Sequence, residues 1–373
     1  TEPTPNPETF ECNYSISSNI SASVNEKNSV DSNKIDNSQN VENKTNKNVE
    51  NAQNSAQTIE NGNIPAQNDS NAAKIVNNAA QNVDNSNLNK EKPQNNDENN
   101  TEKPKTKPFV HLHLHTEYSL LDGIARIDQV VDLAKERGYP AVAMTDHGNM
   151  YGALKFYKKC LSTGVKPILG TEFYLCEDRF DKVSKSKYYH LILLAKNNEG
   201  YKNLIKLNST AFIDGFYYKP RIDYKCLREH AKGLICLSAC LAGHIPQLLI
   251  QDKYDEAKEV ALMMKDMFED GDFYLEVQNH GIPEQQIVNK GLARMSKETG
   301  IKLVATNDVH YVTKDDWETQ DVLLCVQTGK QMEDQNRMRM PEHEFYFKTY
   351  EEMLEALPNF EEALNTTLEI ADK

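Results

Sequence analysis

The sequence of 373 residues lacks several features that would assign it to common classes of protein. It has no apolar run long enough to cross a membrane and no secretory signal pattern at its start. Its seven cysteines (12, 160, 176, 226, 236, 240 and 325) show no paired framework and no C-x-x-C motif. These absences favour a reducing, cytoplasmic compartment and argue against a disulfide-stabilised or membrane protein.

Motifs of several enzyme classes are also missing. The sequence contains no G-x-x-x-x-G-K-[ST], no G-x-G-x-x-G and no G-x-S-x-G. It therefore gives no support for nucleoside-triphosphate binding, dinucleotide binding or serine-hydrolase activity. The net charge is −14, of which −9 belongs to residues 108–373. This argues against a generally basic nucleic-acid-binding surface, although bound divalent cations would reverse the field inside a site.

Aromatic residues are almost absent from the first 107 positions, which are rich in Asn, Ser, Gln, Glu and Lys. Such a segment cannot bury enough apolar surface to offset chain entropy, so residues 1–107 are predicted to be a disordered, low-complexity tail. We expect one large domain over residues 108–373, with its main body over 108–340 and a C-terminal edge over 341–373. The missing initiator Met indicates a piece of a longer product or a processed chain.

Residues 109–123 form the segment around which the rest of the folded chain can be interpreted, F-V-H-L-H-L-H-T-E-Y-S-L-L-D-G. In an extended strand alternate residues share a face, so His111, His113 and His115 would point one way. Buried imidazoles need partners, and two of them with Asp122 can bind a metal together. The alternative is a hydrogen-bonded core histidine, a role that suits His111 because it lies deepest in the strand.

Apolar strands alternate with helical patterns along the remainder of the chain. Strands are expected at 140–145, 166–175, 188–195, 233–238, 273–277 and 302–306, with helices between them and a short strand and two helices at the end. With the opening strand this makes seven strand–helix units, which predicts an α/β fold and favours a closed, TIM-like barrel over an open sheet.

Active sites of such barrels lie at the carboxyl ends of the strands. Side chains that can bind metal ions fall at seven of these strand ends, although one of them, His190, lies earlier in its strand. The nine candidate ligands are His113, His115, Asp122, His147, Glu172, His190, Cys240, Asp308 and His310. Nine ligands exceed the need of one tetrahedral zinc and would serve two or three cations. Imidazole with carboxylate suits Zn²⁺, Mn²⁺ or Fe²⁺, and the thiolate favours zinc. Closely spaced cations of this kind are a phosphoester hydrolase design.

Other polar residues have weaker claims. His280 is a further ligand candidate at the rim of the barrel, and Asp146 is expected to fix its loop or orient His147. Lys219 and Arg221 would meet a substrate phosphate or, as the simpler alternative, carry solvated charges.

Six motifs occur in order: H-L-H-T-E-Y-S-L-L-D-G (113–123), A-M-T-D-H-G-N (143–149), K-P-I-L-G-T-E (166–172), Y-H-L-I-L-L-A (189–195), L-S-A-C-L-A-G (237–243) and T-N-D-V-H-Y (306–311). Together they resemble the polymerase-and-histidinol-phosphatase (PHP) domain, in the form found in the alpha subunit of bacterial DNA polymerase III, a C-family replicative polymerase. The runs L-K-F-Y-K-K (154–159) and M-P-E-H-E-F-Y-F-K (340–348) also resemble that form.

The resemblance implies a distorted seven-stranded barrel and the same nine metal ligands, with Asp122, His147 and Asp308 in catalysis. It also implies two or three divalent ions (Zn²⁺ or Mn²⁺, with Mg²⁺ or Fe²⁺ as alternatives) and 3′–5′ exonuclease activity on DNA. The implied partners are the DNA 3′ end, the remaining polymerase domains and other replisome subunits, with no membrane.

Two departures from the family pattern stand out. The tail before Pro108 is not part of the usual domain, and the sequence stops before the catalytic carboxylates of a polymerase. No second exonuclease interrupts the motifs, which fits the uninterrupted type of domain. The alternatives are a metal-stabilised structural or interaction module, and a histidinol-phosphatase-like phosphomonoesterase.

Overall fold

The computed structural model describes residues 106–183 and 187–373. The tail predicted over residues 1–107 therefore lies outside the described residues, apart from its last two. Lys107 donates to the hydroxyl of Tyr350 (2.7 Å) and to the carboxylate of Glu361 (3.1 Å), so the described chain begins against its own C-terminal helices.

Seven strands form one curled sheet: β1 Ala141–Met144, β2 Lys166–Cys176, β3 Tyr188–Ala195, β4 Arg221–Asp223, β5 Leu234–Leu237, β6 Phe273–Val277 and β7 Leu303–Ala305. Their order is β1-β2-β3-β5-β6-β7, with β4 paired to β2. All pairs are parallel except those of β3, which runs antiparallel to both β2 and β5. The α/β class is confirmed, and the reversed β3 departs from the all-parallel order of a regular TIM barrel.

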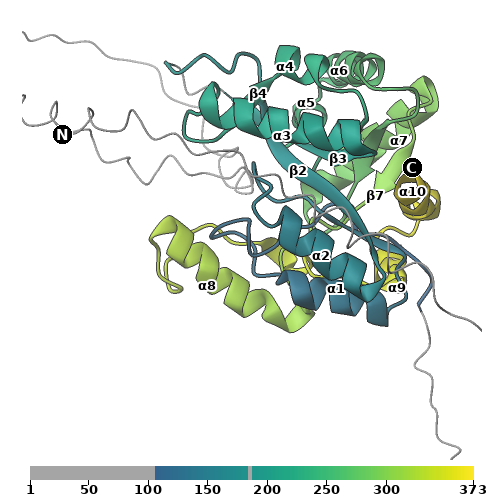
Figure 1. Ribbon diagram of the computed structural model, residues 1–373. Coiled ribbons are helices and arrows are strands. Elements are labelled where there is room, and N and C mark those ends of the chain that lie inside the picture. Colours follow the sequence, from purple (N-terminus) through teal and green to yellow (C-terminus); the bar gives the residue numbers. More distant parts are fainter. Residues whose placement is uncertain (1–105, 184–186) are drawn as a thin grey trace, which may run out of the picture. The chain divides into compact units, whose positions relative to one another are not determined.

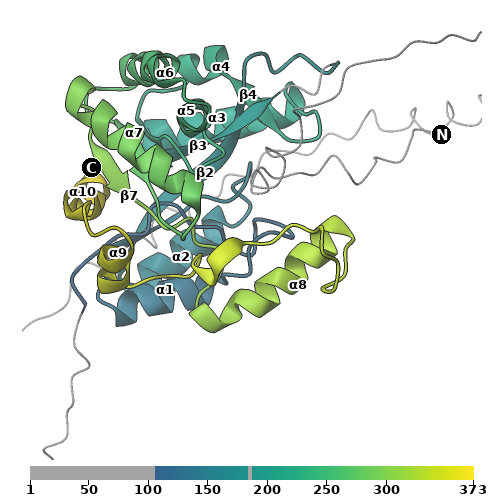
Figure 2. The same cartoon turned by 180° about the vertical axis from the view of Figure 1, so that it is seen from behind.

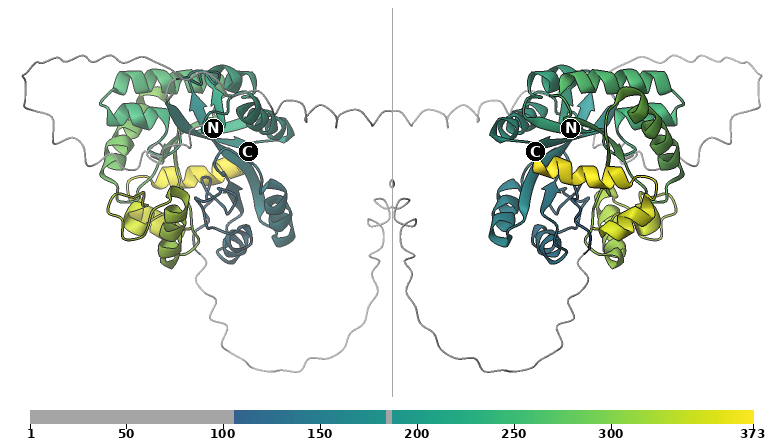
Figure 3. Two further views of the ribbon diagram at one scale, coloured as in Figure 1. Left: turned by 90° about the vertical axis from the view of Figure 1, so that its left-hand side faces the viewer. Right: turned by 90° about the vertical axis from the view of Figure 1, so that its right-hand side faces the viewer.

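The strands are apolar on both faces because helices cover them. The helices are α1 Ile127–Glu136, α2 Ala153–Thr163, α3 Asn198–Ile213, α4 Tyr224–Glu229, α5 His244–Ile250, α6 Tyr254–Met267, α7 Pro283–Thr299, α8 Trp317–Thr328, α9 Tyr350–Ala356 and α10 Glu361–Asp372. Helices α1 and α2 pack together (Figure 1), and α5, α6 and α7 form a second group (Figure 2). The yellow α10 packs on β7 and is seen from both sides in Figure 3.

Helix boundaries follow the local sequence closely. α2 and α7 end at Gly164 and Gly300, which adopt the left-handed conformation that glycine tolerates best. α3 begins after Asn197, whose side chain accepts hydrogen bonds from two backbone amides of the first turn. The short elements β4, α4 and α5 were not predicted, because three to seven residues carry too little periodicity to stand out.

The expected opening strand is an irregular extended segment instead. Its backbone bonds to elements on both sides: Ala143 N donates to His111 O (2.9 Å), and His115 N donates to Val309 O (2.7 Å). Val309 N in turn donates to His113 O (3.2 Å). The segment thus lies between β1 and the residues after β7, where it completes a hydrogen-bonded ring. The prediction of a regular strand was wrong, but the segment occupies the expected place.

The short strand expected at residues 344–347 is reduced to a single bridge between Tyr311 and Tyr346. Phe345 O accepts from His310 N (2.8 Å), so this segment still supports the loop after β7. No helix in the described residues has the length and apolar content needed to cross a membrane.

Candidate metal centre

The predicted ligands converge at one edge of the sheet, where the parallel strands end. β1 continues through a bridge between His147 and Glu172, and Gly148 N donates to Glu172 O (2.8 Å), which sets the loop of His147 beside β2. His190 is the third residue of β3. Because β3 runs in the opposite direction, its beginning lies at the edge where its neighbours end, which explains why this ligand comes early in its strand.

The most buried part of the centre joins four side chains. The Nε2 atoms of His113 and His115 lie 3.1 Å apart, and each lies 3.1 Å from Asp308 Oδ1. Glu172 Oε2 lies 3.3 Å from the first of these nitrogens and 2.9 Å from the second. Two imidazole nitrogens and two carboxylate oxygens therefore face one small space.

Two further groups share members with this one: His115, His147 and His310, and His147, Glu172 and His190. The ligand atoms of each group lie within 4.8 Å of one another. The ring of His115 contacts those of His147 and His310, at centroid distances of 4.0 and 4.4 Å. Overlapping groups with shared ligands are the arrangement expected for more than one cation.

Asp122 and Cys240 lie at the margins of these groups. Asp122 Oδ2 is 2.5 Å from His147 Nε2 and 3.8 Å from His310 Nε2. Cys240 Sγ is 3.8 Å from His190 Nδ1. All nine predicted residues are thus gathered at one place, seven of them inside the compact groups.

Left-handed backbone conformations occur beside the ligands. Asp308 itself has φ of 44°, and Leu121 and Ala239, which directly precede Asp122 and Cys240, have φ of 62° and 66°. Non-glycine residues rarely adopt these angles, and such strain is usually stored at functional sites. The chain bends sharply at these three points to aim polar side chains inward.

Mutual electrostatics stabilise the charged forms of these groups. Burial lowers the pKa of His147, but the carboxylates of Glu172 and Asp122 outweigh it and raise the pKa to about 9. Burial raises the pKa of Glu172, but His190 and His147 outweigh it and hold the pKa well below its usual range. The pKa of the Cys240 thiol is raised well above its ordinary value by burial and by nearby carboxylates. Without a cation, imidazolium ions would neutralise the carboxylates.

The donor set fits divalent metal ions. Asp122 Oδ1 is buried and has no hydrogen-bond partner in the described part of the chain, so an acceptor lone pair is available to a cation. Hydrogen-bonded neighbours turn ring nitrogens of His113 and His115 toward the same carboxylates, as ligating imidazoles require. Mixed nitrogen and oxygen donors suit Zn²⁺, Mn²⁺ or Fe²⁺.

A buried hydrogen-bond network orients His115. Ser119 Oγ donates to Asp146 Oδ1 (2.8 Å) and so accepts from His115 Nδ1 (3.0 Å). The same hydroxyl also accepts from His147 N (3.1 Å). Asp146 therefore acts on His115 and on the backbone of His147 through Ser119, a residue that the sequence analysis did not identify.

A second supporting residue, Glu276 on β6, was also missed. Its Oε1 lies 2.7 Å from His113 Nδ1 and accepts from Gln278 Nε2 (2.9 Å) and from Thr306 Oγ1. Glu276 N donates to Ser238 Oγ (2.8 Å). A glutamate inside the apolar strand F-Y-L-E-V was the available signal, since a buried carboxylate requires partners.

Three weaker candidates lie outside the ligand groups. His111 bonds to Lys348 O (2.9 Å) and packs on aromatic rings, and burial lowers its pKa to about 3, as suits a core histidine. His280 bonds to Asn307 O and Gln285, and its pKa is also lowered to about 3 by burial. Arg221 is buried and donates to the carbonyl oxygens of residues 215, 179 and 181. Its guanidinium group therefore serves the fold and is not placed to bind a substrate phosphate.

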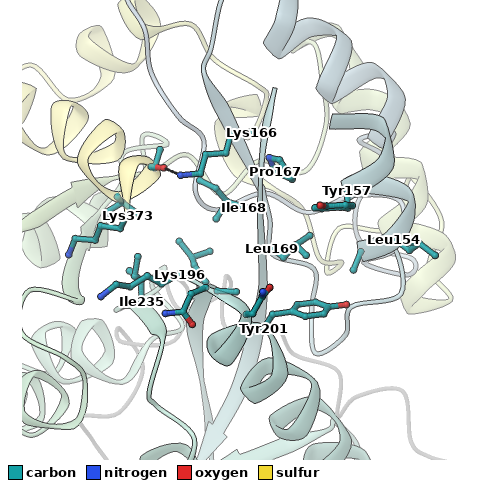
Figure 4. Close-up of a pocket in the computed structure, with 17 residues that line it drawn as sticks. Leu154, Tyr157, Lys166, Pro167, Ile168, Leu169, Lys196, Tyr201, Ile235 and Lys373 are labelled. Carbon is teal, nitrogen blue, oxygen red and sulfur yellow. Dashed lines mark hydrogen bonds between the residues drawn. The ribbon is translucent and has the colours of Figure 1, made fainter. Parts of the chain in front are cut away.

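A separate hollow of about 420 Å³ opens at the opposite edge of the sheet. It is bordered by the start of β2, the end of β3 and α10, and Lys166 crosses it to the carbonyl of Ala371 (Figure 4). None of its lining residues is a histidine, cysteine, aspartate or glutamate. The metal-ligand chemistry of the described chain is therefore concentrated at the other edge.

The model of the PHP domain family matches residues 111–280. The chain is 47% identical over 270 residues to the DNA polymerase III subunit alpha of Borreliella burgdorferi, covering 71% of this chain and 23% of that protein. It is 49% identical over 274 residues to the subunit of the same name from Thermus aquaticus, covering 70% and 22%. The chain thus spans about a quarter of the length of these relatives.

Two solved structures show weaker likeness. One is a proposed metal-dependent phosphoesterase from Bifidobacterium adolescentis, with 17% identity, a TM-score of 0.35, and coverage of 56% of this chain and 89% of that one. The other is the histidinol phosphate phosphatase of Lactococcus lactis, with 13% identity, a TM-score of 0.26, and coverage of 60% and 95%.

Proposed function

We propose that the chain belongs to the PHP domain family, whose model matches residues 111–280, and that its metal centre hydrolyses phosphodiesters as a 3′–5′ exonuclease on DNA. The observation that carries the proposal is the convergence of His113, His115, Glu172 and Asp308 within one buried space, with five further donors around it. Every position of the family's ligand pattern holds a competent ligand here.

The chemistry follows from the arrangement of donors. These donors would hold divalent ions, which would supply polarisation of a phosphoryl oxygen, a lower pKa for a bound water and stabilisation of a leaving oxygen. His113, Glu172 and Asp308 are almost fully buried and would form the fixed base of the site. Asp122 and His147 are its more exposed members, with 10% and 14% of their side chains accessible, so substrate would approach from their side.

Asp122 and His147 are also suited to proton handling. His147 Nε2 and Asp122 Oδ2 lie 2.5 Å apart, close enough to share a proton at the solvent-facing side of the centre. We assign the catalytic roles to Asp122, His147 and Asp308. The first two would lie beside the reacting phosphate, and Asp308 would lie in the buried floor of the site. All nine residues would contribute metal ligands.

DNA is proposed as the substrate because the curated relatives are DNA polymerase III alpha subunits. A 3′ end released by a polymerase would be trimmed here, and the partners would be the remaining polymerase domains and other replisome subunits in the cytoplasm. We propose two or three ions, with Zn²⁺ or Mn²⁺ favoured by the mixture of imidazole, carboxylate and thiol donors.

The test is stepwise shortening of a 5′-labelled single-stranded oligonucleotide by the 373-residue chain loaded with Mn²⁺ or Zn²⁺. Loss of activity on chelation and in Asp308→Asn would support the proposal. A phosphomonoester assayed in parallel separates a histidinol-phosphatase-like activity. Intact oligonucleotide in the presence of at least two bound metal equivalents would refute the exonuclease.

A structural role is the second candidate, favoured by the position of the centre at the closure of the ring. The segment that carries His113 and His115 is bonded on one side to β1 and on the other to Val309, which lies between Asp308 and His310. Metal bound there would stabilise the closure without any hydrolysis. Metal-dependent melting in a chain that cleaves neither substrate would favour this alternative.

A further inference from the structure

We propose that Lys219 binds a phosphate of the polynucleotide adjacent to the phosphate held at the metal centre. This subsite rests on the proposed function and deepens it, because it distinguishes a polynucleotide from a simple phosphoester. Sequence alone left Lys219 undecided between a phosphate contact and a solvated charge, and the structure now gives it a defined place.

The backbone of Lys219 is fixed beside the loop of His147. Tyr217 N donates to Lys219 O (3.1 Å) across a tight turn in which Tyr218 has φ of 60°. Pro220 follows and packs against Gly148: a Cβ atom on that glycine would lie 2.8 Å from Pro220 Cγ. Since Gly148 directly follows His147, the position of Lys219 is tied to that of a candidate ligand.

The side chain of Lys219 points back toward the centre. Its Nζ lies 5.2 Å from the centroid of the Tyr174 ring. That ring stacks with His147 at 6.2 Å and 18°, and meets His190 edge-on at 5.4 Å. Tyr174 is two residues after Glu172 on β2, so both side chains leave the same face of the strand. One tyrosine ring thus joins the ammonium group to two candidate ligands.

The charge of Lys219 is not neutralised by a neighbouring carboxylate. Lys155, Lys159 and Lys196 pair with acidic side chains, whereas Lys219 forms no ion pair with any residue from 106 to 183 or from 187 to 373. Its side chain is half-buried and held over an aromatic ring, which restricts its motion. An ammonium group of this kind is a suitable point-charge ligand for a phosphate.

The geometry separates two kinds of substrate. A small phosphoester occupies only the metal centre and offers Lys219 nothing to bind. A polynucleotide carries a further phosphate beyond the one being hydrolysed, and Lys219 lies beside the centre rather than in it. The exposed ring of Tyr218, 57% accessible, lies next to Lys219 and offers a face on which a base can stack.

The experiment compares Lys219→Gln with wild type, both loaded with Mn²⁺ in the full 373-residue chain. We expect the KM for oligothymidylate to rise roughly tenfold with kcat unchanged, the size of one lost charged hydrogen bond. The slope of log KM against log salt should fall by about 0.7, as for one single-strand phosphate contact. KM for bis-p-nitrophenyl phosphate should not change.

Two variants serve as controls. Lys219→Arg should restore the KM for oligothymidylate, and Lys290→Gln, which removes an exposed charge on α7, should change nothing. An unchanged KM for oligothymidylate in Lys219→Gln would overturn the proposal. Equal losses on both substrates, or a fall in metal content or melting temperature, would overturn it too, in favour of a contact at the centre or a structural role.

Direct binding separates this inference from the proposed function. If the wild-type chain hydrolyses neither substrate, the proposed function fails, and anisotropy of fluorescent oligothymidylate with the metal-loaded chain still tests Lys219. A roughly tenfold weaker Kd in Lys219→Gln that Lys219→Arg restores supports the subsite. Equal Kd values for wild type and Lys219→Gln refute it.

Discussion

The Nδ1 atom of His113 lies 2.7 Å from Oε1 of Glu276, and both side chains are completely buried. The carboxylate fixes the proton on Nδ1, which leaves the Nε2 lone pair directed at Asp308 and Glu172. A ligating imidazole needs this tautomer, so a residue that touches no metal ion would control how tightly the centre binds one.

Glu276→Gln should therefore lower the metal affinity by roughly ten- to a hundredfold, the usual cost of losing such a partner. Competition with a chromogenic chelator measures the change. Glu369→Gln is the control, because the Glu369 carboxylate pairs with Lys302 instead of with a candidate ligand. Equal affinities in the two variants would contradict the orienting role of Glu276.

His115→Ala should remove at least one equivalent of bound metal and abolish hydrolysis, because His115 belongs to two of the three ligand groups. Elemental analysis of the purified variant gives the metal content. His230→Ala provides the comparison, since His230 bonds to the carbonyl of Cys226 on α4 and should keep its full complement. Full metal content in His115→Ala would remove this residue from the ligand set.

The stability of the metal-free chain should fall as the pH rises from 6.5 to about 9. The pKa of His147 is raised in the fold from 6.5 to about 9, since Glu172 and Asp122 outweigh the lowering effect of burial. Protonated His147 therefore stabilises the fold fully below pH 6.5, by roughly 3 kcal/mol, and this is lost as the pH rises through about 9.

Denaturant unfolding of the chelator-treated protein across this pH range measures the effect. Metal binding should show the opposite trend, because the ion must displace the proton and its affinity rises with pH. His147→Gln should flatten the unfolding profile between pH 6.5 and 9, and an equally steep profile in that variant would exclude His147 as the titrating group.

Gly243→Ala should destabilise the fold by more than Cys240→Ser. A Cβ atom at Gly243 would lie 2.2 Å from Ser238 O, a backbone atom that cannot move aside without shifting the loop of Cys240. We expect a loss of roughly 2–4 kcal/mol in the free energy of unfolding, in the range of severe local strain and overpacking. Cys240→Ser should lower zinc binding with little loss of stability in the metal-free chain. Similar unfolding free energies for Gly243→Ala and wild type would show that the loop adapts.

Much of this centre could be predicted from residue types at strand ends, because parallel strands bring their carboxyl ends together. His147, just after β1, follows that rule directly, whereas Glu172 lies inside β2 (Lys166–Cys176), opposite His147. His190 does not follow the rule, and its place became clear only with the direction of β3, which no local pattern in Y-Y-H-L-I-L-L-A reveals. Strand direction depends on the connection through residues 177–187 and on pairing partners far away in the sequence.

The supporting residues were missed for a different reason. Ser119 and Glu276 bond to the imidazoles of His115 and His113, which lie 4 and 163 positions away, and such pairs leave no periodic trace. The extended segment from His111 to His115 was predicted as a strand from its alternation. Neighbouring segments form backbone hydrogen bonds with it at only a few residues. The structure therefore shows isolated β-bridges where the pattern predicted continuous strand pairing.

The hydrogen-bonded ring around this domain closes at that segment, and the two sides of the closure carry different ligands. His113 and His115 stand on one side, and Asp308 and His310 on the other. A cation bound by ligands from both sides would hold the two segments together, so that opening the ring would first require release of the ion. The exchange of the His115 and Val309 amides with solvent would then depend on free metal concentration, which makes the lifetime of the closed ring a property of its surroundings as well as of its sequence.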